Sequence, residues 1–322
     1  MTNLPEFYRD NCLFQLYLEN KVHAVHHGEI VNTLVDRPVN PNSISGFGEE
    51  QRKFLMIKDV PDYLKFSHTI PKDSGIIRVP QYYGYLVNLK GYTNIGDFLK
   101  EQLSKRNIKN LYSKKRKLDG LGDIEYRVLT GPLEESVYED IFTNFKQLLV
   151  DRFDQKKILN RDLFHWQELY GHCYLRLVNK KALLFVIYKA NKPICIALNY
   201  VLDHSMFSHI QTYDVAYSTY NMGDISMLFQ LEWCLTNNMP IFDVSKGSNP
   251  YKEKWCNHRY RLYYEIIYPK DSTISVFKAN LLIAKLKLKQ KLRDMGLLGN
   301  IINMDKWLYL KHGRKLKGTI SK

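Results

Sequence analysis

The residues best suited to chemistry follow a short apolar run late in the chain. Asp243 ends this run, Gly247 follows in a turn, and Tyr251 and Lys252 follow on a short segment. A carboxylate within hydrogen-bond reach can accept the proton of an attacking amine or hydroxyl. Asp243 can equally cap the turn 245–247. Lys252 can neutralise a phosphate or carboxylate of an acceptor, or it can simply be solvated.

A second candidate site is the turn over residues 218–224, between a predicted strand and a predicted helix. The first amides of a helix have no partner within it, so they can hold an anion such as a pyrophosphate. Gly223 would permit a close approach. A single glycine is also common in ordinary strand-to-helix turns, so both interpretations stay open.

The second half of the chain supplies the elements that must position these residues. Alternating and β-branched runs predict strands, and apolar residues at helical spacing predict helices. In order, we expect a strand over 124–129, a helix over 133–152, strands over 183–188, 194–201 and 207–217, a helix over 223–238, a strand over 241–244, a helix over 249–256 and a strand over 261–268.

The first part of the chain reads as a small mixed α/β unit that ends in a basic helix. Asn94 or Thr93 can cap a helix that begins near Ile95 and continues toward Leu118. Its segment 104–117 contains several Lys and Arg residues and no acidic residue, so it could bind a polyanion. The rival interpretation is a nucleic-acid helix, but the segment has one aromatic residue and matches no usual nucleic-acid module.

The tail alternates apolar and basic residues over 276–293 and predicts a cationic helix, ended by Gly296. One hypothesis places the segment 278–293 on an anionic membrane surface. The alternative is a solvated helix whose leucines pack on the domain. The sequence leaves both open.

Composition limits the class of protein. The 322 residues are 45% hydrophobic and carry a net charge of +14, which is typical of an ordered globular chain that attracts anions. The five cysteines form no C-x-x-C pair and the histidines lack matching ligands, so neither a disulfide framework nor a metal is indicated. Without a signal-peptide pattern or a long apolar window, we expect a cytoplasmic protein, either free or peripheral to the inner membrane face.

Three stretches resemble a known family. Residues 103–118 resemble a basic helix, residues 213–223 a strand and turn before a donor-binding helix, and residues 242–255 a phenylalanine-aspartate strand end with a glycine and then tyrosine-lysine-x-x-tryptophan. Together they are similar to GNAT-related acyltransferases of the cellulose-biosynthesis and exopolysaccharide acetyltransferase type, which are cousins of the Fem-type aminoacyltransferases. The resemblance covers roughly residues 80–270.

This resemblance implies an α/β (α+β) fold with two GNAT-like lobes, each a mixed and mostly antiparallel sheet flanked by helices. The expected domains are a degenerate N-terminal lobe over 1–122 with its basic helix 95–118, a C-terminal acyltransferase lobe over 123–271, and a basic helical tail over 272–322. The expected catalytic residues are Asp243, Tyr251 and Lys252. The expected donor contacts are Tyr220, Asn221, Met222, Gly223, Lys246 and Gly247, and the expected acceptor contacts are Gln211, Tyr213, Tyr217 and Trp255.

The implied activity is transfer of an acyl group, with acetyl the first choice, from an acyl-CoA to an amine on a cell-envelope or polysaccharide precursor. The amine would attack directly, and no metal would take part. The usual GNAT phosphate loop has several glycines, whereas this turn has only Gly223. The alternatives are a Fem-like transferase that uses aminoacyl-tRNA, and a non-catalytic GNAT-like protein that binds polyanions.

Overall fold

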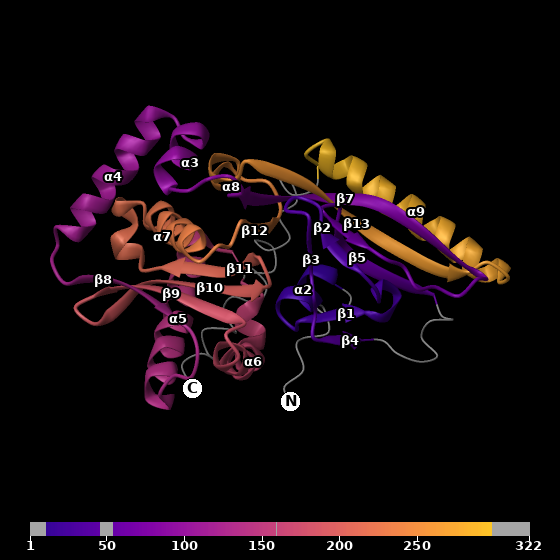
Figure 1. Cartoon of the computed structure of the whole chain (residues 1–322), viewed down its shortest axis with the longest axis horizontal. Coiled ribbons are helices and arrows are strands. Elements are labelled where there is room, and N and C mark those ends of the chain that lie inside the picture. Colours follow the sequence, from indigo (N-terminus) through magenta and orange to yellow (C-terminus); the bar gives the residue numbers. More distant parts are fainter. Residues whose placement is uncertain (1–10, 46–53, 159, 298–322) are drawn as a thin grey trace.

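One eight-stranded sheet organises the computed structural model (Figure 1), which describes residues 11–45, 54–158 and 160–297. The strand order is β5-β13-β7-β12-β11-β10-β9-β8, and all neighbours are antiparallel except β11 and β12. The strands are β5 (Leu55–Pro61), β7 (Ser74–Asn88), β8 (Ile124–Leu129), β9 (Ala182–Lys189), β10 (Lys192–Leu202), β11 (Ser205–Tyr213), β12 (Ile241–Lys246) and β13 (His258–Pro269).

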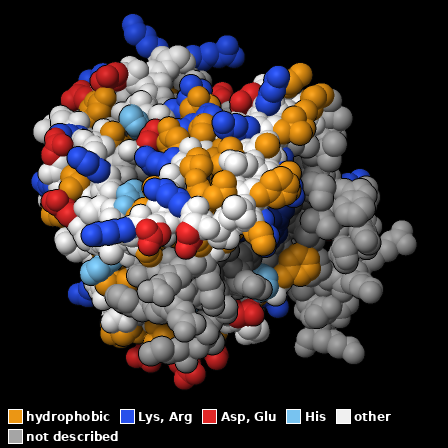
Figure 2. All heavy atoms as spheres, turned by 90° about the vertical axis from the view of Figure 1, so that its right-hand side faces the viewer, with side chains coloured by type: hydrophobic (Ala, Val, Ile, Leu, Met, Phe, Trp, Pro, Cys, Tyr) orange, Lys and Arg blue, Asp and Glu red, His pale blue; other side chains and the backbone are white. Residues whose placement is uncertain are grey.

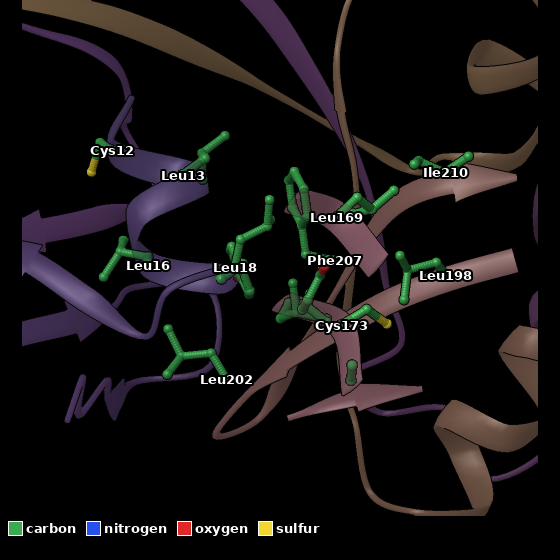
Figure 3. Packing of buried hydrophobic residues seen from close by; sticks show 14 of the residues in the cluster. Cys12, Leu13, Leu16, Leu18, Leu169, Cys173, Leu198, Leu202, Phe207 and Ile210 are labelled. Atoms are coloured by element: carbon green, nitrogen blue, oxygen red, sulfur yellow. The ribbon is translucent and has the colours of Figure 1, made fainter. Parts of the chain in front are cut away.

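Helices cover both faces of this sheet. On one side of β8 to β12 lie α3 (Ile95–Gln102), α4 (Lys105–Asp119), α7 (Met222–Thr236) and α8 (Pro250–Trp255), and on the other lie α5 (Glu135–Lys156) and α6 (Trp166–Val178). Alternate residues of β9 therefore enter different cores. Leu184 packs with the residues of α5 and α6, in the cluster that also holds Leu169, Cys173 and Leu198 (Figure 3), and Phe185 packs with those of α7. Burial on both faces explains why these strands read as continuous apolar runs.

Small elements and one long helix complete the other half of the molecule. The short strands β1 (Lys21–His23) and β4 (Ser43–Ser45) pair, as do β2 (Ile30–Asn32), β3 (Arg37–Pro38) and β6 (Leu64–Phe66), beside helices α2 (Cys12–Tyr17) and η1 (Ala24–His26). Helix α9 (Thr273–Asp294) lies along β7 and β13 (Figure 1). None of the helices in the described ranges is long and apolar enough to span a membrane.

The predicted fold class, a mixed and mostly antiparallel α/β fold, is confirmed. The sheet is nevertheless continuous across the two predicted lobes, because β13 pairs with β7 and β5 from the first part of the chain. Strands so far apart in sequence pair without any local sequence pattern that would indicate their partner. The domain limits 1–122, 123–271 and 272–322 remain a proposal.

Two boundaries differ from the sequence prediction. The single helix expected over 95–118 is two helices, because Leu103 is extended and the Ser104 hydroxyl accepts the Asn107 amide to begin α4. The strand expected over 207–217 ends at Tyr213, because Asp214 accepts the Ala216 amide and begins the 3-10 helix η4 (Val215–Tyr220). The capping role of Asn94 is confirmed, and α6 was not predicted.

Gly84→Ala should destabilise the protein, because β7 and β13 approach closely at this residue. An added Cβ would lie 2.1 Å from Cζ of Tyr260. We expect a loss of about 1–3 kcal/mol in the free energy of unfolding, measured by urea denaturation. Gly96→Ala, in the first turn of α3, is the control and should cost much less, because an added Cβ would lie no closer than 3.2 Å to a neighbouring atom, Oδ1 of Asn94. Equal stability of the two variants would contradict this packing.

Candidate functional site

A cavity of about 830 Å³ lies where β11 and β12 part. The two parallel strands are in register only at Ser205↔Ile241, Met206↔Phe242 and Phe207↔Asp243. Beyond these pairs, β11 lines one side of the cavity with Ser208, His209, Gln211 and Tyr213, and β12 lines the other with Val244, Ser245 and Lys246. The opening therefore exposes backbone that would otherwise continue a parallel ladder.

Irregular backbone marks both strands at this opening. The register of β10 against β11 shifts between Leu198 and Asn199, so His209 is the extra residue of a bulge. On β12 the register against β7 shifts after Asp243, and Ser245 has a φ of 65°. A non-glycine residue in the left-handed region is strained and needs support from its surroundings.

Asp243 gives that support from a fully buried position. Its carboxylate accepts hydrogen bonds from the Tyr63 hydroxyl at 2.7 Å, from the Tyr260 hydroxyl at 2.8 Å and from the Ser245 amide at 2.6 Å. Burial raises its pKa to about 6, although the three donors oppose that shift. The bond to Ser245 is the turn cap foreseen as an alternative, and the carboxylate is outside the cavity lining.

Tyr251 and Lys252 project from α8 into the same cavity. The Tyr251 hydroxyl donates to the Gly223 carbonyl at 2.9 Å, which ties α8 to the start of α7. Lys252 Nζ donates to the carbonyl oxygens of Lys246 at 2.7 Å and Ser245 at 3.1 Å. Burial lowers the pKa of Lys252 to about 8, while Asp243 opposes that shift. This lysine is therefore not simply solvated.

The start of α7 faces the cavity through Asn221, Gly223 and Asp224. The amides of Asp224 and Ile225 donate to the Asn221 carbonyl, and Met222 is fully buried, which leaves the amide of Gly223 as the helix-start donor, among described residues, that can face an anion. Asp224 adds a negative charge at this point. Lys254 Nζ balances that charge at 2.6 Å, and the Trp255 indole donates to Asp224 at 2.8 Å.

The structure brings together seven of the predicted site residues along the cavity: Gln211, Tyr213, Asn221, Gly223, Lys246, Tyr251 and Lys252. The other six lie outside its lining: Tyr217, Tyr220, Met222, Asp243, Gly247 and Trp255. Met222 and Trp255 are fully buried and pack in the core next to α7. Tyr217 and Tyr220 pack against the same core from η4.

Several cavity residues were not foreseen, because they come from other parts of the chain. Arg152, in the last turns of α5, donates to the Gln211 carbonyl at 2.9 Å and its guanidinium lies 4.1 Å from the centre of the Tyr213 ring. Buried Asp59 of β5 lies 2.5 Å from Lys246 Nζ and accepts from Asn11 Nδ2 at 2.5 Å. No local spacing links these residues to β11 and β12. The remaining cavity residues missed by sequence are Phe14, Lys58, Arg161, Asp162, Phe207, Ser208, His209, Asp224, Met227, Val244 and Ser245.

A second group of ionisable residues lies outside the cavity lining. Glu265 of β13 is buried and lies 2.6 Å from His26 Nε2, 3.2 Å from His68 Nε2 and 3.1 Å from Arg78 Nε. The three side chains of His26, His68 and Glu265 are close enough to share a metal ion. The Arg78 guanidinium already compensates the carboxylate charge, so the arrangement is that of a buried ion-pair cluster.

Glu265→Gln should reduce the sensitivity of the fold to acid. Burial alone would raise the pKa of Glu265, but the hydrogen bonds and charges of His26 and His68 lower it from 4.5 to about 2. A lowered folded-state pKa contributes stability above the ordinary value and loses it as pH falls toward 2. Urea denaturation between pH 5 and 3 should show a steeper loss for the native chain than for the variant. Parallel curves would contradict the assignment.

Comparison with known protein families gives one match, and it falls on the part of the chain that forms most of the cavity. Residues 105–253 match the family model described as an acetyltransferase (GNAT) domain. This segment contains α4, the strands β8 to β12 and most of α8, and so most of the cavity. No curated protein matches the sequence.

Several solved structures match part of the chain at low identity. They include the C-terminal domain of a putative lysylphosphatidylglycerol synthetase from Agrobacterium fabrum (13% identity, TM-score 0.42, 65% of this chain and 66% of that one) and L-PGS from Bacillus licheniformis (14%, 0.44, 68% and 67%). A structure of FemX is another (8%, 0.43, 58% and 61%).

The alignments reach about two thirds of the length of these structures, and similarity this distant says nothing about substrate. The family match is more specific, because it covers the parted strands and the start of α7. Residues 105–253 therefore match the model of a GNAT acetyltransferase domain, and this match supports a transferase of the N-acyltransferase type.

Proposed function

We propose that this protein transfers an acyl group, with acetyl the first choice, from an acyl-CoA to an amine of a cell-envelope or polysaccharide precursor. The observation that carries the proposal is the cavity between β11 and β12, with the start of α7 at its edge. An extended thioester arm can pair with the exposed edge of β11, as an added strand would. The amide of Gly223, at the start of α7, then suits the pyrophosphate.

Direct attack is the chemistry that this cavity favours. The nitrogen of the neutral amine bonds to the thioester carbonyl carbon, and a backbone amide on the open edge of β11 stabilises the oxyanion. Collapse breaks the carbon–sulfur bond, and the thiolate takes a proton as the amide product forms. None of the five cysteines lines the cavity, so the lining offers no thiol for an acyl-cysteine intermediate.

Asp243 is our proposed acceptor for the proton that the amine loses. Its pKa of about 6 leaves it mostly ionised at neutral pH. Its oxygens are occupied by Tyr63, Tyr260 and the Ser245 amide, so the proton has to reach it through a hydroxyl or water relay. Besides this role, Asp243 holds the turn that presents Lys252 to the cavity.

The charges of the cavity favour anionic substrates. Its lining holds five cations, Lys58, Arg152, Arg161, Lys246 and Lys252, against the three acids Asp59, Asp162 and Asp224. Lys246 is paired with Asp59, and Lys252 donates only to neutral carbonyls. We therefore propose that Lys252 meets a phosphate or carboxylate of the acceptor. An acceptor of this kind could also be a lipid-linked amine that carries a phosphate.

The second candidate donor is aminoacyl-tRNA, because α4 presents a basic surface beside the start of α7. Lys105, Arg106, Lys109, Arg116 and Lys117 are exposed on this helix, and Lys114 donates to the Thr219 carbonyl at 2.6 Å. Phosphate contacts by such a row would make tRNA binding steeply dependent on salt. Competition between tRNA and CoA for one site would favour this candidate over a non-catalytic polyanion-binding role.

Acetyl-CoA and longer acyl-CoA thioesters should release thiol when incubated with the protein and a panel of amino sugars and phosphate-bearing amines. Asp243→Asn should lower turnover by roughly 10²–10⁴-fold if the carboxylate is the base, and circular dichroism should show that the variant is folded. Thiol release is followed with a chromogenic disulfide. Absence of thiol release with every thioester would contradict the acyl-CoA donor. Unchanged turnover of the Asp243→Asn variant would exclude Asp243 from the mechanism.

The affinity for an anionic acceptor should weaken at alkaline pH. The positive charge of Lys252 is lost as pH rises through its pKa of about 8, so KM for that acceptor should rise above this pH. Lys252→Arg is the matched control, since its charge persists and should flatten the rise. Initial rates at varied acceptor concentration measure the effect. An identical pH profile for both proteins would exclude Lys252 from acceptor binding.

A further inference from the structure

Helix α9 carries two apolar faces, and the domain covers only one of them. Ala279, Leu286 and Gln290 are buried against β7 and β13. On the opposite face Ile274, Phe277, Leu281 and Leu288 are exposed, with exposed fractions of 66, 69, 63 and 59%. These residues recur at helical spacing, so they form one ridge along the outer side of the helix. We call these four residues the outer ridge.

Lysines border the outer ridge on both sides. Helical geometry places Lys278, Lys285 and Lys289 along one edge of the ridge and Lys287 and Lys291 along the other. All five are exposed, and the only acid on α9 is Asp294 at its end. Figure 2 shows hydrophobic side chains interleaved with Lys and Arg on the face that looks out from this end of the molecule.

We propose that the outer ridge of α9 docks on an anionic lipid surface, with the helix parallel to the plane of the membrane. A helix of 22 residues is about 33 Å long, which places the whole ridge within one interface. Apolar side chains enter the boundary between headgroups and acyl chains, and lysines at both edges reach the phosphates with their apolar stems buried.

Charge favours lipid over a second copy of this chain as the occupant. The ridge has the spacing of a coiled-coil seam, so two α9 helices can pair in principle. Such a pair would bring the lysines of both edges against lysines of the other copy, with no acid on α9 to compensate them except Asp294. An anionic membrane gives every one of these lysines a favourable partner.

The sheet holds α9 firmly enough for this role. Leu286 and Ala279 pack with Val79 and Ile266, and the Arg293 guanidinium donates to Gln81 Oε1 at 2.8 Å. The ridge is therefore presented by a fixed element that needs no release from the domain. Of the leucines of α9, Leu286 packs inward on the domain, while Leu281 and Leu288 are exposed and are the ones that the proposed membrane contact would use.

Flotation of the full chain with lipid vesicles tests the proposal without any substrate, so its failure would leave the acyltransferase proposal untouched. The protein should float with vesicles of equal parts phosphatidylglycerol and phosphatidylcholine, and much less with phosphatidylcholine alone. The exposed double change Phe277→Asp and Leu281→Asp should reduce the bound fraction by roughly tenfold or more. Lys285→Gln with Lys289→Gln should weaken binding less and reduce its dependence on salt.

The control is the double change Val137→Asp and Leu175→Asp, on exposed positions of α5 and α6, which should float like the native chain. Analytical ultracentrifugation of the native chain should show a monomer without lipid. Absence of flotation, or equal flotation of the ridge variant and the native chain, would overturn the proposal. A dimer that the ridge variant dissociates would also overturn it, because the second copy would then be the occupant.

Discussion

The parting of β11 and β12 is the constraint on which the site depends. Two parallel neighbours in one sheet would ordinarily continue their ladder, yet here it ends after Phe207↔Asp243. β11 follows β10 on one side, whereas β12 follows β7 on the other, with Lys246 opposite Gly84. The opening is therefore built into the order of the sheet, because each strand is held to a different outer neighbour.

A buried carboxylate stabilises the bend on the β12 side. The Asp243 carboxylate accepts hydrogen bonds from Tyr63, Tyr260 and the amide of the strained Ser245. Leaving any of these buried donors unpaired would cost about 1–3 kcal/mol of stability. The ion pair between Lys246 and Asp59 ties the end of β12 to β5. The same contacts place Lys252, so the geometry of the strand and the charge of the cavity are coupled.

Sequence patterns predicted the elements of the second half well, because each strand and helix there has its own local signal. Positive φ at Ala190 and Asn191 matches the turn chemistry predicted for the β9–β10 hairpin. The break at Ser104 was missed because its capping competes with a helical pattern that runs through it. The pairing of β13 with β7 and β5 was missed because no local residue signals a partner so distant.

The part of the site that is local in sequence was predicted, and the part that depends on distant pairing was not. Residues of one contiguous segment, Gly223 to Lys252, converge because α7, β12 and α8 are neighbours in sequence as well as in space. Arg152 and Asp59 reach the cavity only through the sheet and its covering helix. Asp243 was recognised by its place at a strand end, but its enclosure depends on Tyr63 from a turn after β5, which a spacing argument cannot supply.

A crystal structure of the protein with CoA tests the central claim most directly. The account predicts an extended pantetheine arm between β11 and β12, bonded to the backbone between Ser208 and Tyr213, with the pyrophosphate at the amide of Gly223. CoA bound outside this opening, or strands that close the gap without a ligand in it, would contradict the account.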